Sequence, residues 1–226
     1  SLYFIVFGSV IGGYVQKIDG ISYGSYIVPG LLMLTLLTQS ISNTSFGIFF
    51  PKFNGTIYEI LAAPISSFEV VLAFVGAGAT KTLIVGIVIF ITSTFFVDVQ
   101  VKYPLLMIFL MLIVAFTFAL FGFLIGLLSS NFEQLSVIPT LVITPMVFLG
   151  GSLYSLDMLP SFWQTVSLAN PILYMINAFR YSILGASDLE ALGFSINYAI
   201  FMIIGFIVLF ASICLWFLHK GRGIRT

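Results

Sequence analysis

The chain has 226 residues, of which 60% are hydrophobic and only 7% are charged, and its formal net charge is zero. Soluble domains carry about a quarter charged residues, so this composition excludes a soluble globular protein and indicates a polytopic membrane protein. The balanced charge gives no indication of a nucleic-acid partner. The single cysteine, Cys214, excludes a disulfide within the chain.

Six apolar runs predict six membrane-spanning helices, since backbone polar groups in lipid must be satisfied within each segment. The runs cover residues 2–15, 27–50, 70–97, 104–128, 135–149 and 195–218. The first run is shorter than the roughly 20 residues that a crossing needs, and we expect it to continue upstream of Ser1. The whole chain, residues 1–226, is predicted to be a single all-α transmembrane domain.

Two further apolar segments lie between the fifth and sixth predicted spans. They follow Gly150-Gly151, cover residues 160–169 and 171–184, and each begins with a proline. Both are too short to cross a bilayer, so they predict a re-entrant helical hairpin that dips into one membrane face. We expect that face to be wet enough for charged side chains, with the two acidic residues after the hairpin in a solvated turn. The residues of this region that we single out are Trp163, Tyr174, Tyr181, Arg180, Asp157, Asp188 and Glu190.

The loop of residues 51–69 is predicted to contain another short helix. The spacing Thr56-x-x-Glu59 predicts a capping box that starts a helix over residues 57–63, and Ser66-x-x-Glu69 predicts one that starts the third span. A short helix here is either a surface that a cytoplasmic partner grips or a capped turn lying on lipid headgroups. Its apolar side consists of Ile57, Ile60 and Leu61.

Polar side chains within the spans are few. Those of the second span, Thr35, Gln39, Ser42 and Asn43, are spaced so that they share one helix face. Such a face turns toward the bundle or toward a water cavity, so interhelical hydrogen bonding and the lining of a pathway both fit. Lys81 lies within the third span, where it either snorkels to an interface or faces an aqueous cavity or an anionic group.

The basic residues of the C-terminal tail determine the predicted orientation. Lys220, Arg222 and Arg225 place the C-terminus in the cytoplasm. With six spans, the loop of residues 51–69 then faces the cytoplasm and the hairpin faces outside.

No motif for catalysis, nucleotide binding or metal binding is present. The sequence has no GxxxxGK[ST], HExxH or GxSxG pattern and no Cys/His metal spacing. We therefore expect no enzymatic activity, no metal and no cofactor in this chain. A secondary transporter should carry acidic residues or histidines within its spans, together with inverted repeats, and neither is visible. An ion-coupled transporter and a non-transporting membrane scaffold are kept as the alternatives.

One pattern between Ile143 and Arg180 is specific. In this pattern, several apolar positions are followed by two small residues and then by an apolar residue with a proline directly after it. About ten residues later a second proline is followed by apolar residues, and a basic residue ends the pattern. The sequence resembles, in this pattern and over essentially its whole length, the permease subunit of type-2 ABC exporters. That family usually begins with an amphipathic helix, which is missing from this sequence. The matching residues are Ile143, Met146, Leu149, Gly150, Ser152, Leu159, Pro160, Pro171, Ile172, Leu173, Tyr174 and Arg180.

The resemblance implies an ATP-driven export system in the cytoplasmic (inner) membrane of a bacterium. Two permease subunits would pair within the lipid bilayer, a homodimer being the simplest arrangement. Two copies of an ABC ATP-binding subunit would dock beneath them and hold the ATP and magnesium. The short cytoplasmic helix would then be a coupling helix, whose contact residues are Tyr58, Glu59, Ile60 and Leu61.

The resemblance also implies where the substrate passes. The second and fifth spans would line the outward path, and the external hairpin would act as a lid, with Trp163 and Tyr174 at the level of the outer headgroups. A path that is mostly apolar with hydroxyls and amides favours an amphipathic or lipid-like cargo. The predicted lining residues are Thr35, Gln39, Asn43 and Met146.

Overall fold

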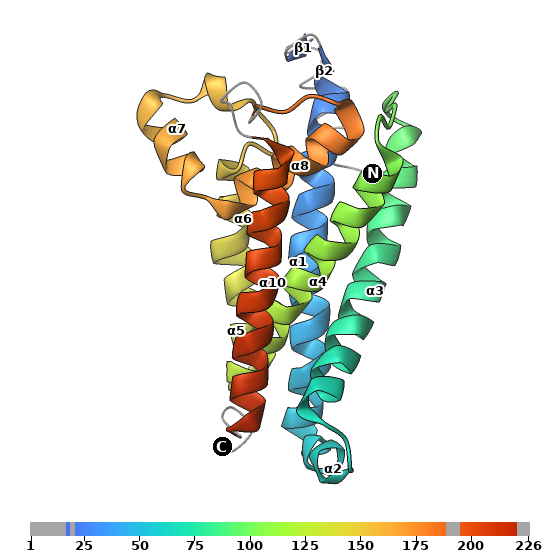
Figure 1. Cartoon of the computed structure of the whole chain (residues 1–226), viewed down its shortest axis with the longest axis vertical. Helices are drawn as coiled ribbons and strands as arrows, with labels where there is room; N and C mark the ends of the chain where they lie inside the picture. The colour runs from blue at the N-terminus through green and yellow to red at the C-terminus, as the bar shows by residue number, and fades with distance from the viewer. Residues whose placement is uncertain (1–16, 19–20, 189–194, 221–226) are drawn as a thin grey trace. The chain divides into compact units, whose positions relative to one another are not determined.

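The computed structural model describes residues 17–18, 21–188 and 195–220, and for Lys17, Ile18 and Leu61 the backbone alone (Figure 1). Within these residues five helical stretches are long and apolar enough to cross a membrane. The class is therefore all-α and polytopic, as predicted, and each stretch coincides with a predicted span. The remaining predicted span, residues 2–15, lies outside the described residues. The five stretches are α1 (Tyr23–Asn54), α3 (Ser67–Thr94), α4 (Pro104–Leu128), Phe132–Leu149 and α10 (Ile196–His219).

Helix α1 extends further at both ends than the sequence predicted, over Tyr23–Asn54 rather than residues 27–50. Lys52, which was expected in a loop, lies in its last turn. The Lys52 ammonium donates hydrogen bonds to the carbonyl oxygens of Leu127 and Ser129, at 2.7 and 2.9 Å. These carbonyls lie at the C-terminal end of α4, where the helix cannot satisfy them itself. Lys52 is thus a helix-capping residue of α4.

The fifth span begins at Phe132 instead of Leu135. Asn131 caps it, since the Gln134 backbone N–H donates to the Asn131 side chain (3.3 Å) and the Gln134 side chain accepts from Ser130 N–H (2.7 Å). The span is irregular. It comprises α5 (Phe132–Ile138), a π-helical segment η2 (Pro139–Ile143) and α6 (Thr144–Leu149). Pro139 lacks a backbone N–H, which accounts for the break in the regular α-helical ladder at this point.

The chain packs as two compact units. The first unit holds the described parts of residues 1–35, 84–111 and 144–202, and the second holds those of 36–83, 112–143 and 203–226. A two-residue antiparallel ladder, β1 (Lys17–Ile18) with β2 (Ile21–Ser22), precedes α1 in the first unit. The second unit has a hydrophobic core to which α1, α2 (Ile57–Ala62), α3, α4 and α10 contribute.

Two short helices lie in the first unit where the sequence predicted them (Figure 1). They are α7 (Ser161–Leu168) and α8 (Pro171–Leu184). Asn170 caps α8 by accepting a hydrogen bond from the Ile172 N–H, and Pro171 takes the first helical position as expected. Pro160, in contrast, precedes α7 as its N-cap residue and is not its first helical residue.

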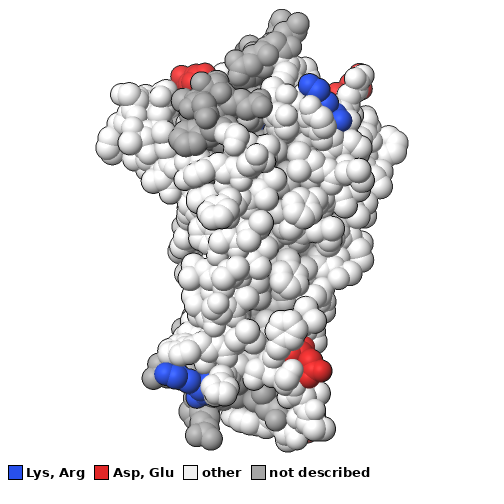
Figure 2. Space-filling view, viewed as in Figure 1, with Lys and Arg blue, Asp and Glu red and all other residues white. Residues whose placement is uncertain are grey.

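The outer faces of the long helices are apolar. In the view of Figure 2 most of the visible surface carries neither basic nor acidic side chains. Leu105 of α4 and Phe201 of α10 are 83% and 75% exposed. Large apolar side chains this open to the surroundings fit a lipid environment and would be unfavourable in water.

Helices α1 and α4 approach closely in the second unit because two glycines of α4 face α1. A Cβ atom added at Gly122 would lie 2.5 Å from the Ile41 carbonyl oxygen, and one at Gly126 would lie 2.5 Å from that of Ser45. Both obstacles are backbone atoms of α1, which cannot move aside cheaply. The Gly122-x-x-x-Gly126 spacing therefore serves direct backbone-to-backbone packing.

We predict that Gly122→Ala lowers stability by about 1–3 kcal/mol, the usual cost of overpacking. Gly76→Ala is the matched control, because a Cβ atom there meets nothing within 4 Å and alanine is the better helix former. Thermal unfolding of the two variants in the same detergent measures the difference. Equal unfolding temperatures would contradict the close contact between α1 and α4.

Candidate functional site

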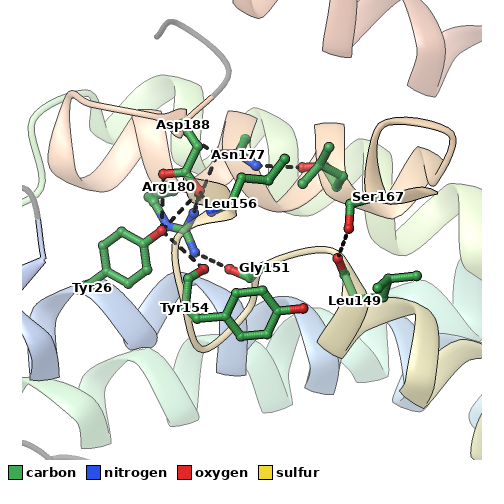
Figure 3. Close-up of polar contacts among 10 residues, drawn as sticks. Tyr26, Leu149, Gly151, Tyr154, Leu156, Ser167, Asn177, Arg180 and Asp188 are labelled. Atoms are coloured by element: carbon green, nitrogen blue, oxygen red, sulfur yellow. Dashed lines mark hydrogen bonds and ion pairs between the residues drawn. The ribbon is translucent and has the colours of Figure 1, made fainter. Parts of the chain in front are cut away.

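A buried ion pair lies in the first unit (Figure 3). Nη1 of Arg180, on α8, is 3.3 Å from Oδ2 of Asp188, and these side chains are only 1% and 5% exposed. The ring of Tyr26, on α1, lies against the guanidinium, with 3.9 Å between the Arg180 Cζ and the ring centroid. The Tyr26 hydroxyl donates to the Asp188 carboxylate at 3.1 Å. The cation thus has both a carboxylate and an aromatic face as partners, a strong arrangement where water is excluded.

The same pair binds the turn that follows α6. The Arg180 Nη2 donates to the carbonyl oxygen of Gly151 at 2.5 Å. The Leu156 N–H donates to Asp188 Oδ2 at 3.2 Å, and the Asn177 side-chain oxygen accepts from the Asp188 N–H at 3.1 Å. Gly151 has a φ of 74°, a left-handed conformation that favours glycine and reverses the chain here. The cluster therefore fastens α1, the turn after α6 and α8 to one another.

This arrangement corrects the sequence-based expectation for these charges. Arg180 and Asp188 were expected on a wet face, with Asp188 in a solvated turn, but both are buried and paired. Gly185, with a φ of 74°, ends α8 and turns the chain so that Asp188 returns to Arg180. That helix stop was visible in the sequence and could have suggested the pairing. Asp157 is exposed as expected, and Glu190 lies outside the described residues.

The aromatic residues predicted for the headgroup level differ in exposure. Trp163, on α7, is exposed and packs edge-to-face against the ring of Phe162. Tyr174, on α8, is buried, and its hydroxyl donates to the Leu168 carbonyl oxygen at 2.8 Å. Tyr174 is thus part of the packing between α7 and α8, and its burial differs from the exposure that a headgroup contact needs.

Helix α2, the predicted coupling segment, belongs to the second unit and turns Ile57 toward the core of that unit. Ile57 is buried in the hydrophobic core of this unit, and Ile60 packs against the same core. Ile57 is therefore held by the chain itself, whereas Ile60 is only half-buried. The outward side presents Tyr58, which is 51% exposed, and the exposed carboxylate of Glu59. The side chain of Leu61 lies outside the described residues.

The two predicted capping boxes have different outcomes. Ser66 and Glu69 form a complete box: the Ser66 N–H donates to Glu69 Oε2 at 2.7 Å, and the Glu69 N–H donates to Ser66 Oγ at 3.3 Å. Thr56 forms none, because its backbone is already helical (φ −66°, ψ −14°) and its side chain makes no capping bond. Helix α2 still begins at Ile57, and it ends at Ala62, one residue before the predicted end.

The predicted pathway residues fall in both units. Gln39 is exposed, and Thr35 and Asn43 are half-buried on the same side of α1. The Asn43 amide donates to Thr82 Oγ1 of α3 at 3.3 Å, an interhelical bond of the kind that the sequence left open. Met146 is half-buried, and its carbonyl oxygen accepts from the Asn170 side chain at 2.6 Å. Gln39 and Asn43 belong to the second unit, whereas Thr35 and Met146 belong to the first.

Among the described residues no group of three or more His, Cys, Asp or Glu side chains is placed to hold a metal ion. The single cysteine, Cys214, is buried and donates to the Leu120 carbonyl oxygen.

Long apolar helices with a few anchored polar groups define a multi-pass membrane protein, and comparison with known proteins identifies the family. Residues 1–184 match the family model described as ABC-2 type transporter. The chain is 38% identical over 226 residues to the inner membrane transport permease YadH of Escherichia coli K12, covering all of this chain and 86% of that protein. The chain therefore belongs to the ABC-2 type transporter family.

More distant relatives belong to nodulating bacteria. Nodulation protein J of Rhizobium meliloti is 28% identical over 189 residues, which cover 82% of this chain and 71% of that protein. Nodulation protein J of Rhizobium leguminosarum bv. viciae is 25% identical over 190 residues, with coverage of 81% and 71%. This chain is thus a transport permease subunit and a multi-pass inner-membrane protein, and its family implies association with an ATP-binding subunit.

We predict that Asp188→Asn destabilises the protein by about 3–5 kcal/mol, because it leaves the buried Arg180 guanidinium without its counter-charge. Adding Arg180→Met should restore much of the loss, since the second change removes the unpaired charge. Asp157→Asn, at an exposed aspartate, should have little effect. Thermal unfolding of the purified variants checks all three. A single Asp188→Asn variant as stable as the wild type would show that the pair is not needed.

Proposed function

We propose that the chain is the membrane-spanning subunit of an ATP-driven export system that moves its substrate outward across the bacterial inner membrane. Two copies pair as a homodimer, and two ATP-binding subunits dock on the cytoplasmic side. Those partners bind the ATP and magnesium and hydrolyse the nucleotide, and this chain has no enzymatic activity of its own. Residues 1–226 act as one transmembrane domain, since α1, α3, α4 and α10 each contribute to both compact units.

The proposal rests on the way in which the neighbouring residues hold α2 in place. A helix of six residues is too short to be stable alone, so it must be held by its surroundings. Gly55, with a φ of 81°, turns the chain into α2, and the Ser66–Glu69 capping box fixes the start of α3 beyond it. The buried Ile57 pins the helix to the core. A force applied to the outward side of α2 is therefore passed to the helices of that core.

Coupling to the ATP-binding subunit would use the outward side of α2. Tyr58 and Glu59 offer an aromatic ring and a carboxylate to the partner, while Ile60 and Leu61 complete the segment. Aromatic residues are favoured anchors of protein interfaces, and a carboxylate suits a basic groove. These are the residues that the sequence singled out, and the buried Ile57 anchors the helix that carries them.

The outward path would be lined by the polar side of α1 and by the span from Phe132 to Leu149. Thr35, Gln39, Asn43 and Met146 are the lining candidates, each of them half-buried or exposed within its own unit. The short helices α7 and α8 would form an external re-entrant hairpin that includes Trp163, Tyr174 and Arg180. The buried cluster around Arg180 supports this, because a lid above a path needs a fixed anchor.

We predict that Glu59→Arg leaves the permease folded, since the side chain is exposed, but weakens docking of the ATP-binding subunit at least about tenfold through charge reversal. Co-purification and ATPase activity of the complex in lipid measure the effect. Asp98→Arg is the control, because Asp98 is also exposed but lies in the first unit, away from α2 along the chain. Docking and ATPase activity unchanged by Glu59→Arg would rule out α2 as the coupling helix.

We predict that a cysteine at position 186 reacts with a membrane-impermeant thiol reagent added to intact spheroplasts. Ala186 is exposed just after α8, on the side proposed to be external. Ser130→Cys, at an exposed position before α5, should react only after the membrane is opened. Both variants are made in a Cys214→Ala background. The opposite labelling pattern would invert the proposed orientation, including that of the C-terminus.

A further inference from the structure

Lys81 is a charged residue near the middle of a membrane-spanning helix. It is the fifteenth of the 28 residues of α3, so roughly 20 Å of helix lie on either side of it at 1.5 Å per residue. The hydrocarbon core of a bilayer is about 30 Å thick, which puts Lys81 roughly 15 Å from either edge. A four-carbon side chain does not reach the headgroups from that depth. Its ammonium therefore needs a local partner.

The described part of the chain pairs no carboxylate with Lys81. Among the described residues the one ion pair is between Arg180 and Asp188. The six acidic residues that the structure describes lie in loops, in first turns of helices or in short segments between spans. The same residues of a second copy would therefore bring no carboxylate to mid-membrane either. The six are Glu59, Glu69, Asp98, Glu133, Asp157 and Asp188.

The ammonium instead borders an open cavity of about 440 Å³ in the second unit. Besides Lys81, its lining has a polar part, Ser42 and Asn43, and an apolar part that includes Phe46 and Phe50. One hydrogen of the Asn43 amide is directed to Thr82, so a second N–H is available to a ligand. Phe46 and Phe50 are both exposed on α1. One cation and two neutral polar groups thus lie next to two open aromatic rings.

We propose that this cavity binds the anionic headgroup of an amphiphile, a phosphate or carboxylate, at Lys81, Asn43 and Ser42, with its apolar chain along Phe46 and Phe50. A neutral ligand would leave the ammonium unpaired at hydrocarbon depth, which is costly. A small inorganic anion would leave the two rings without an apolar partner. An amphiphile with one negative group provides a counter-charge for the Lys81 ammonium and an apolar chain that contacts the two rings. Insofar as that amphiphile is cargo, the assignment rests on the proposed export function and narrows its substrate class.

The test uses the full-length protein in nanodiscs of phosphatidylcholine, with dodecyl phosphate as the probe and dodecyl maltoside as its uncharged counterpart. Lys81→Met should weaken dodecyl phosphate binding at least about tenfold, as expected for loss of a charge-assisted contact. Lys81→Arg, which keeps the charge, should retain it. Lys220→Met is the control, because that cation lies beyond the end of α10, over the ring of Trp216. Dodecyl maltoside should bind all four proteins alike.

Two results would overturn the proposal. One is wild-type affinity for dodecyl phosphate in Lys81→Met, and the other is an equal loss in Lys220→Met, which would indicate general attraction to the membrane surface. Lys81→Met removes a charge from an apolar environment and should unfold at the wild-type temperature or above it. Lys81→Gln, which keeps a polar side chain, is the second variant should the first not fold.

Two arms of the experiment distinguish the source of the amphiphile, and either positive result supports the anion site. Competition by phosphatidylglycerol added to the nanodisc identifies a bilayer lipid. Stimulation of the ATPase of the complete complex by dodecyl phosphate, in the wild type and Lys81→Arg but not in Lys81→Met, identifies transported cargo. Binding is measured without the ATP-binding subunit. The anion-site proposal would therefore hold even if α2 does not couple to the ATP-binding subunit. Conversely, a failure of the anion-site proposal would not contradict the role of α2 in coupling.

Discussion

The need to neutralise charge away from water organises the first unit. The guanidinium of Arg180 cannot stay buried unless carboxylate, aromatic and carbonyl groups surround it, and Asp188, Tyr26 and Gly151 supply them. These three residues come from separate parts of the chain. Satisfying one cation therefore fixes the end of α8, the turn after α6 and the start of α1 at once. The short helices before the last span are held by this polar contact in addition to apolar packing.

The need to neutralise charge away from water is met in two different ways by two lysines of the second unit. Lys52 is satisfied within the chain, because its ammonium caps the carbonyl groups at the end of α4. Lys81 borders a cavity and is paired with no carboxylate of the described residues. The two lysines carry the same ammonium group, but the partner of Lys52 belongs to the chain, whereas the proposed partner of Lys81 is a bound molecule. A charge satisfied internally has a structural role, whereas one that needs an outside partner marks a place where something binds.

Much of the fold could be predicted from the sequence because run length and apolar content directly reflect bilayer thickness. Five of the six predicted spans and the two short helices were found for this reason, and the Ser66–Glu69 box was found from a purely local spacing. Predictions failed where the outcome depends on distant residues. Tyr26 and Asp188 are separated by 162 positions, and no local pattern relates them. Lys52 resembled a loop residue because its partners at the end of α4 are equally remote in sequence. The burial of Ile57 likewise depends on a core built by other helices.

The glycine contact between α4 and α1 has a mechanical consequence. At Gly122 backbone lies against backbone, and at Gly126 both the Ile48 side chain and the Ser45 backbone are in close contact. Lys52 also bridges to the end of α4, so we expect the two helices to move together within the second unit. The polar side of α1 therefore cannot tilt or rotate by itself: any rearrangement that changes its exposure must carry α4 with it. Ile57 of α2 packs into the same core as Ala119 and Phe123 of α4, so a displacement of α2 acts on that joined pair.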